Sequence, residues 1–382
     1  MPPPTRRTRL AFERLDDRIM PAFMTGSEVV VGTDAGVPAV VRLLDPATGA
    51  VQDTIEPFGS GFTGGVRVAV GDVTGDGYPD LVCAAGPGGG PAVAVYDGKV
   101  GRVASFFAFD PSFRGGVNVA VGDVTGGGTG EIVVGAGPGG GPAVGVFDAA
   151  GNNLRSFFAY DPGFHGGVNV AAGDVTGDGR AEVVTAPQSG GGPNVRVFDP
   201  AAGFTGPQSS FFAYAPDFTG GVAVAVADVD GDGRAEVVTG AGPGGAPAVG
   251  VFRGDGGEED AFYAFAADFR GGVRVGAADL VGDGASVVLA AAGPGGGSEV
   301  NAYRGGDELA SSFFAFPADQ RTGFYLAGSP DALTFDPALY DVYSGSIPNP
   351  GGVDNTPNAP TGYGYDGTSG DQTGDTSNVF DY

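Results

Sequence analysis

Residues 62–97, FTGGVRVAVGDVTGDGYPDLVCAAGPGGGPAVAVYD, decide the fold, because the chain repeats this stretch several times with substitutions. The opening motif, Phe-x-Gly-Gly, returns every 51 to 54 residues, and a degraded copy begins at Gln320. A period of this length indicates supersecondary units that are stacked or arranged radially. The five clear copies of the motif begin at Phe62, Phe113, Phe164, Phe218 and Phe269.

Each copy contains four short apolar runs separated by turn sequences, which predicts four β-strands. The first two runs are joined by GDVTGDGYPD and the next two by a Gly-Pro-Gly-Gly-Gly stretch. Four antiparallel strands per unit form the blade of a β-propeller. In the first copy the expected strands are residues 66–70, 80–85, 91–96 and 103–109.

The two ends of the repeat region predict how the ring closes. Residues 28–58 match strands two to four of a copy, and residues 323–328 match strand one. Together they would complete a sixth blade and leave no sheet edge open. We therefore expect an all-β, six-bladed β-propeller of four-stranded antiparallel blades over residues 25–328, closed by a blade that both ends of the chain share.

Composition agrees with this fold class and limits the partners. Of 382 residues, 75 are Gly and 29 are Pro, yet 42% are hydrophobic and lie in short alternating runs, as in an all-β protein. A formal charge of -26 argues against nucleic acid or an anionic membrane as a partner. The single cysteine, Cys83, excludes an internal disulfide and falls in an expected strand, so a buried thiol is expected.

The segments outside the repeats differ in character from them. Residues 1–24 are basic at the start and then amphipathic, and they resemble the N-terminal sorting segments of some bacterial surface proteins. No standard signal peptide and no apolar run of membrane-spanning length is present. Residues 329–382 are acidic and contain no Lys, Arg or His, so we expect a disordered tail.

The turn between the first two expected strands carries the candidate chemistry. Acidic or hydroxyl side chains occupy positions one, three, five and nine, and Gly at position six allows a tight wrap. Carboxylates this close repel one another, and calcium, which accepts six to eight irregularly placed oxygens, relieves the repulsion. The three complete loops supply Asp72, Thr74, Asp76 and Asp80; Asp174, Thr176, Asp178 and Glu182; and Asp228, Asp230, Asp232 and Glu236. Position seven would add the backbone carbonyl of Tyr78, Arg180 or Arg234.

Two further copies of the loop are incomplete. The loop at Asp123 has Gly at position five, and the loop at Asp279 has Val at positions three and nine. We expect these two loops to bind calcium weakly or not at all, with the acids serving only turn formation. An EF-hand is excluded because position twelve of the most acidic loop is Thr239, inside a predicted strand. A Gly-x-Gly-x-x-Gly match at Gly135 leads into a strand, so a dinucleotide site is excluded too.

The remaining candidate groups favour packing over catalysis. Each copy ends in an aromatic cluster, and its recurrence favours contacts between blades over sugar stacking. The only histidine, His165, falls at the variable position of the Phe-x-Gly-Gly motif, and no Ser or Cys has a partner base in the sequence. An acid pair for glycoside hydrolysis stays an alternative. Unusual polar residues recur only at one position of the first strand and look scattered: Arg67, Asn118, Asn169, Arg274 and Tyr325.

The repeat resembles a known family. Phe-x-Gly-Gly, GDVTGDGYPDLV, AGPGGGP and AVAVYD are similar to the FG-GAP repeats of integrin-α-type propellers and of the bacterial VCBS-type repeat proteins. The chain departs from them in its Gly-Gly after the Phe, in Ala-Gly-Pro for Gly-Ala-Pro, and in six blades where integrins have seven. The resemblance implies a calcium-stabilised propeller outside the cell that serves adhesion or the binding of carbohydrate or protein.

We therefore expect a calcium-binding, extracellular or cell-surface propeller, monomeric, that binds a surface glycan or protein and is not an enzyme. Two alternatives stay open: a propeller hydrolase or lyase acting on polysaccharide, and a purely structural component of a surface coat.

Overall fold

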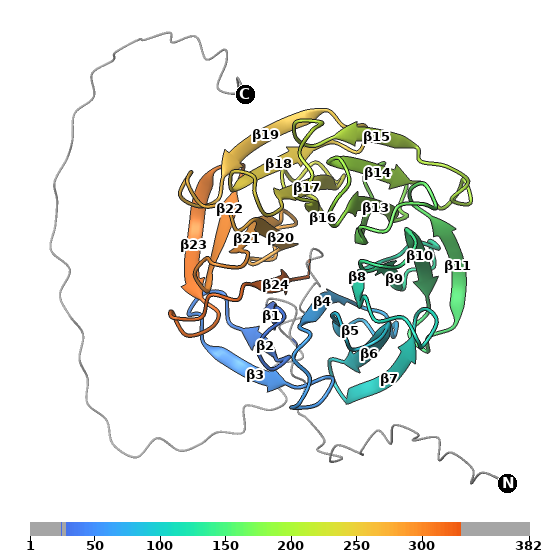
Figure 1. Ribbon diagram of the computed structural model, residues 1–382, viewed down its shortest axis with the longest axis horizontal. Coiled ribbons are helices and arrows are strands. Elements are labelled where there is room, and N and C mark those ends of the chain that lie inside the picture. Colours follow the sequence, from blue (N-terminus) through green and yellow to red (C-terminus); the bar gives the residue numbers. More distant parts are fainter. Residues whose placement is uncertain (1–23, 25–27, 330–382) are drawn as a thin grey trace, which may run out of the picture. The chain divides into compact units, whose positions relative to one another are not determined.

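The computed structural model describes Met24 and residues 28–329, and in these residues every regular element is a β-strand. The strands form six four-stranded antiparallel sheets arranged as the blades of a ring (Figure 1). Blade 1 combines β24 with β1 to β3, and blades 2 to 6 each take four consecutive strands. The five sequence copies are therefore blades 2 to 6, and the predicted six-bladed propeller is confirmed.

The strand bounds are as follows. Blade 1 contains β24 (Phe324–Ala327), β1 (Val29–Thr33), β2 (Val41–Leu44) and β3 (Val51–Ile55). Blade 2 contains β4 (Val66–Gly71), β5 (Asp80–Ala85), β6 (Ala92–Asp97) and β7 (Gly101–Phe107). Blade 3 contains β8 (Val117–Gly122), β9 (Glu131–Ala136), β10 (Ala143–Phe147) and β11 (Asn153–Phe158). Blade 4 contains β12 (Val168–Gly173), β13 (Glu182–Pro187), β14 (Asn194–Phe198) and β15 (Ser209–Phe212). Blade 5 contains β16 (Val222–Ala227), β17 (Glu236–Ala241), β18 (Ala248–Phe252) and β19 (Glu258–Tyr263). Blade 6 contains β20 (Val273–Ala278), β21 (Val287–Ala292), β22 (Glu299–Arg304) and β23 (Glu308–Phe314).

Each blade buries both of its faces between two neighbours. The second strand of every repeat, such as β5, is buried along its whole length, and Cys83 lies there without exposure, as expected. Val66, Val68 and Val70 pack in one cluster with Leu43 of blade 1. The outermost strands are largely exposed, at alternate positions in β15 and at all but one position in β11. The hydrophobic core is therefore a series of layers between blades.

Blade 1 closes the ring. Strand β24 pairs antiparallel with β1, and Figure 1 shows these two ends of the described chain side by side. Phe324 of β24 is 1% exposed, and its ring lies 5.6 Å from that of Phe316, which follows blade 6. The predicted sharing of one blade between both ends is confirmed.

The Phe-x-Gly-Gly motif joins each blade to the one before it. The second glycine has a positive φ, +81° at Gly65, which favours glycine, and a Cβ on the first would collide with a backbone carbonyl. The contact that the residue between Phe and Gly makes in every copy is through its carbonyl, so its side chain can vary. That carbonyl accepts the amide of a glycine in the preceding blade at 2.8 to 3.0 Å, in the pairs Gly36–Thr63, Gly88–Arg114, Gly139–His165, Gly190–Thr219, Gly244–Arg270 and Gly295–Arg321.

The aromatic clusters pack between blades, as predicted. The first aromatic ring of a cluster contacts a ring at the end of the third strand of the next blade, with Phe106 lying 5.2 Å from Phe147. The second ring, such as Phe158 or Phe212, is exposed on the outer strand. The predicted fourth strand, 103–109, is shifted: β7 starts at Gly101 and ends at Phe107, where the chain bends toward the next motif.

The expected sorting segment and acidic tail lie outside the described residues, apart from their inner ends. Met24 is buried in the core cluster of blades 1 and 2, and the carbonyl of Ser329 accepts the amide of Asp279 at 2.9 Å. In the described part of the chain, no helix has the length and hydropathy needed to cross a membrane.

A matched pair of truncations tests the closing strand. We expect Phe324→Ala to lower the free energy of unfolding by about 3 to 5 kcal/mol, because it leaves a cavity between blades 1 and 6. The control Phe314→Ala removes a ring that is 56% exposed and should cost about 0.5 kcal/mol or less. Denaturant melts of both variants give the comparison, and equal costs would show that β24 is not integral to the ring.

Candidate metal centre

The loop after the first strand of each whole repeat wraps around its first aspartate. In blade 5, Asp228 Oδ1 accepts the amide of Gly231 at 2.6 Å, and Oδ2 accepts the amide of Gly233 at 2.8 Å. The carboxylates that begin the other four loops accept amides in the same way. The first aspartate therefore shapes the turn in all five loops, including the two incomplete ones. The loops differ in the side chains at their other positions.

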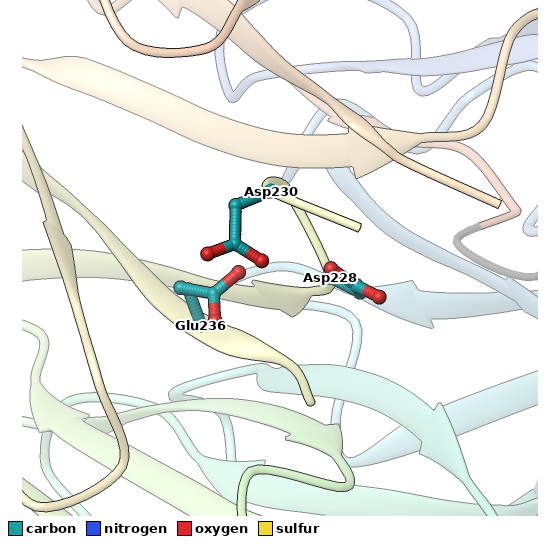
Figure 2. Close-up of side chains that lie close together, drawn as sticks. All are labelled: Asp228, Asp230 and Glu236. Carbon is teal, nitrogen blue, oxygen red and sulfur yellow. The ribbon is translucent and has the colours of Figure 1, made fainter. Parts of the chain in front are cut away.

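The blade 5 loop gathers three carboxylates. One oxygen each from Asp228, Asp230 and Glu236 lies within 4.8 Å of the others, and Figure 2 shows the three side chains close together. Glu236 opens β17 and is only 3% exposed, while Asp230 is exposed on the loop. All three are predicted ligands. The predicted ligand Asp232 lies outside this cluster and accepts the amide of Arg234 at 2.8 Å.

The electrostatics of the position-nine glutamates favour a cation. Burial, together with the negative charges of Asp230, Glu259 and Asp228, raises the pKa of Glu236 to about 7. Burial and the charges of Asp174 and Asp178 raise the pKa of Glu182 to about 7 as well. A divalent cation among these oxygens would offset the repulsion and favour the ionised form.

The blade 4 loop repeats this arrangement with a hydroxyl at position three. Thr176 Oγ1 lies 3.4 Å from Asp174 Oδ1 and 3.3 Å from Glu182 Oε1. Asp178 accepts the amide of Arg180 at 2.9 Å, so its second oxygen is still available. Hydroxyl and carboxylate oxygens are ligands that calcium accepts, so these residues fit the ion.

The blade 2 loop contains a competing positive charge. The ammonium of Lys99, from the turn before β7, lies 3.0 Å from Asp76 Oδ2 and 3.5 Å from the centre of the Tyr78 ring. Asp80 is fully buried, and its carboxylate accepts the amides of Val73, Thr74 and Gly98. The Thr74 hydroxyl is buried and has no hydrogen-bond partner, so its oxygen is available to coordinate an ion. The loop sequence alone did not indicate the contact with Lys99, because that residue is 23 positions beyond Asp76.

The incomplete loops use their acids for other contacts. Asp283 forms an ion pair with Arg304 at 2.9 Å, and that contact lowers the pKa of its carboxyl group. Glu131 accepts both the hydroxyl and the amide of Thr125, at 2.7 and 3.0 Å, as Glu182 accepts the hydroxyl of Thr176 in blade 4, so what the blade 3 loop lacks is the position-five carboxylate. That the two loops bind calcium weakly or not at all stays a prediction.

The loops also connect neighbouring blades through their backbones. The carbonyl of the first aspartate accepts an amide from position eight of the loop in the next blade, as Asp174 does from Ala235 at 2.8 Å. Ordering one loop therefore supports the next blade directly. The four contacts of this kind are Asp72–Gly130, Asp123–Ala181, Asp174–Ala235 and Asp228–Ser286, at 2.7 to 2.8 Å.

His165 and the unusual polar residues of the first strands both have defined positions in the ring. His165 Nδ1 lies 2.8 Å from the carbonyl of Gly140, so this side chain helps to hold a loop between blades 3 and 4. The unusual polar residues of the first strands are not scattered, because the ring brings them to one recess at the mouth of the central channel. The side chains that line the recess include Arg67, Asn118, Asn169, Arg274 and Tyr325.

Comparison with known families supports the resemblance of these repeats to FG-GAP repeats. Residues 64–104 match the FG-GAP repeat, and residues 174–239 match the FG-GAP-like repeat. Each match contains the Asp-rich loop between the first two strands of a blade. The propeller therefore contains FG-GAP-type repeats. No curated protein sequence matches it.

Several solved structures are similar to this chain at low identity. The exotype rhamnogalacturonan lyase YesX is 15% identical, with 77% of this chain and 67% of that chain covered and a TM-score of 0.40. The Bacillus licheniformis rhamnogalacturonan lyase PL11 is 14% identical, with coverages of 74% and 63% and a TM-score of 0.38. The V. cholerae biofilm matrix protein Bap1 is 19% identical, with coverages of 65% and 38% and a TM-score of 0.36. Likeness at this level carries no argument about function.

The raised pKa values predict a pH dependence for the chelated protein. The pKa values of Glu182 and Glu236 are higher in the folded protein than their ordinary value of 4.5. Their contribution to stability is therefore complete below about pH 4.5 and is lost as the pH rises through about 7. We expect Glu236→Gln, which cannot ionise, to reduce the fall in melting temperature between about pH 5 and about pH 8, measured by calorimetry in EDTA.

The control for this experiment is Glu308→Gln, which removes an exposed acid from β23. It should keep the pH dependence of the parent protein. A Glu236→Gln curve that runs parallel to the parent curve would contradict the assignment.

Proposed function

We propose that this propeller is a calcium-binding module of the cell surface or extracellular space that serves adhesion or ligand binding. The observation that carries the proposal is the convergence of Asp228, Asp230 and Glu236 within 4.8 Å, in a loop that the chain repeats. In this proposal calcium stabilises the blades, and the protein is a monomeric binding module, not an enzyme.

The donor set favours calcium over other metals. The complete loops offer carboxylate, hydroxyl and carbonyl oxygens and contain no Cys or His, the ligands that zinc and copper prefer. Magnesium requires a nearly regular octahedron, whereas a loop that supplies oxygens from successive residues suits the flexible coordination of calcium. Within the proposal, the predicted ligands Asp232 and the carbonyl of Arg234 complete the blade 5 site.

The three complete loops are expected to differ in affinity. Blade 5 has a carboxylate at position three, while blade 4 has the neutral Thr176 there, so blade 5 should bind more tightly. Blade 2 should be the weakest of the three because Lys99 must leave Asp76 before an ion can use that oxygen. Lys99 is thus a built-in competitor for one site.

The proposed location follows from the expected affinity. Extracellular calcium modules bind at about 10⁻⁴ to 10⁻³ M, and these loops lack the bidentate glutamate at position twelve that tightens EF-hands. Sites of that strength would stay empty at cytosolic calcium concentrations and fill outside the cell. With a formal charge of -26, the partner we expect is a neutral or basic surface glycan or protein, or one bridged by calcium.

Isothermal titration tests the metal assignment. We expect the parent protein to bind calcium, and chelation to lower its melting temperature, because binding only to the folded state stabilises it. Asp230→Asn should weaken one site by roughly tenfold or more, since it removes one of three converging carboxylates.

The control is Asp283→Asn, which changes an acid at position five of an incomplete loop, where the carboxylate already forms an ion pair with Arg304. It should leave calcium binding unchanged. Equal effects of the two substitutions, or no calcium heat in the parent protein, would rule out the site.

A further inference from the structure

We propose that the mouth of the central channel, at the end opposite the acidic loops, binds the carboxylate group of a small acidic ligand such as a sugar acid. In blade 2, Arg67 lies near the start of β4, whereas Asp72 of the acidic loop follows its end. The two sites are therefore at opposite ends of the same strand. This inference stands independently of calcium binding.

The ring geometry creates this site from equivalent positions. The second residue of the first strand in each blade lines a single recess with a volume of about 90 Å³. Beyond it the channel is lined by small apolar side chains, including Val119 and Ala171, so a ligand inserts only a small group. The six residues, in the order of the ring, are Tyr325, Arg67, Asn118, Asn169, Ala223 and Arg274.

Two guanidinium groups lie over one aromatic ring. Arg67 and Arg274 come from the blades on either side of Tyr325, and their Cζ atoms lie 4.6 and 4.5 Å from the centre of its ring. These cation–π contacts fix both arginines before any ligand arrives, which lowers the entropy cost of binding. Because its ring is already occupied, Tyr325 acts as a support for the arginines and not as a stacking platform.

The mouth carries a positive charge that the protein leaves uncompensated. Arg274 forms an ion pair with Asp34 at 3.1 Å, but none of the ion pairs among residues 28–329 includes Arg67. Arg67 is 7% exposed and makes only a long hydrogen bond of 3.4 Å to the carbonyl of Gly64. A buried cation without an acidic partner is costly, and in a chain of charge -26 its retention indicates an anionic ligand.

Hydrogen-bond donors are left over in the same recess. The Nε atoms of both arginines are buried without contact with solvent and have no hydrogen-bond partner in the structure, so a ligand can reach them only if the side chains shift. Asn169 uses one of its two amide hydrogens on the carbonyl of Val222, at 2.7 Å, and keeps the other. Unsatisfied buried donors cost stability, and a carboxylate accepts several hydrogen bonds at once, so it matches both the charge and the donors.

The test uses sodium glucuronate as the probe, with glucose as its uncharged counterpart and inorganic phosphate as a different oxyanion, in titrations followed by calorimetry. We expect saturable binding of glucuronate and none of glucose. Arg67→Gln should weaken glucuronate binding by about tenfold or more, because it removes a charge-assisted contact. Arg67→Lys, which keeps the charge but loses Nε, should weaken it less.

The matched control is Arg270→Gln, which removes the same charge from an exposed arginine that donates only to the backbone carbonyls of Ala267 and Phe269. It should bind glucuronate like the parent protein. The proposal fails if glucuronate does not bind, if glucose binds equally well, if only phosphate binds, or if Arg270→Gln weakens binding as much as Arg67→Gln.

Discussion

A blade of this protein has two apolar faces, and each face can be buried only against another blade. Strands such as β9 and β21 are buried at every position because they lie between two neighbours. An open row of blades would leave two apolar faces and two unpaired edges in water. The pairing of β24 with β1 removes both problems, so every other contact in the ring depends on that closure.

Closure also gives the two ends of the first strands different roles. At one end, glycine amides bind the carbonyls of the Phe-x-Gly-Gly motifs, and the arginines beside Tyr325 gather at the channel mouth. At the other end, aspartate carbonyls link successive acidic loops. In the proposed account, calcium at this second end rigidifies loops that already connect blades, so metal binding and the stability of the ring are coupled.

Much of this fold could be predicted from the sequence, because repetition exposes what each position shares. The blades, the shared closing blade and the packing of Phe106 against the next blade follow from the period and from strand alternation. Contacts specific to one blade could not be predicted. Lys99, which contacts Asp76, comes from a turn outside the loop motif, and Arg304, which contacts Asp283, comes from the end of β22. The convergence of the polar residues at the channel mouth required the ring itself, since they are about 50 residues apart in sequence and looked scattered.

The central claim is that calcium in the complete loops holds neighbouring blades together, and amide hydrogen exchange with and without calcium tests it most directly. The amide of Ala235 binds Asp174 of the preceding blade, and that of Ser286 binds Asp228, so both report on a complete loop. The account predicts slower exchange of these amides when calcium is added, with little change at Gly139, whose amide binds the carbonyl of His165 at the opposite end of the first strands, away from the acidic loops. Exchange that is unaffected by calcium, or slowed equally at all three amides, would contradict it.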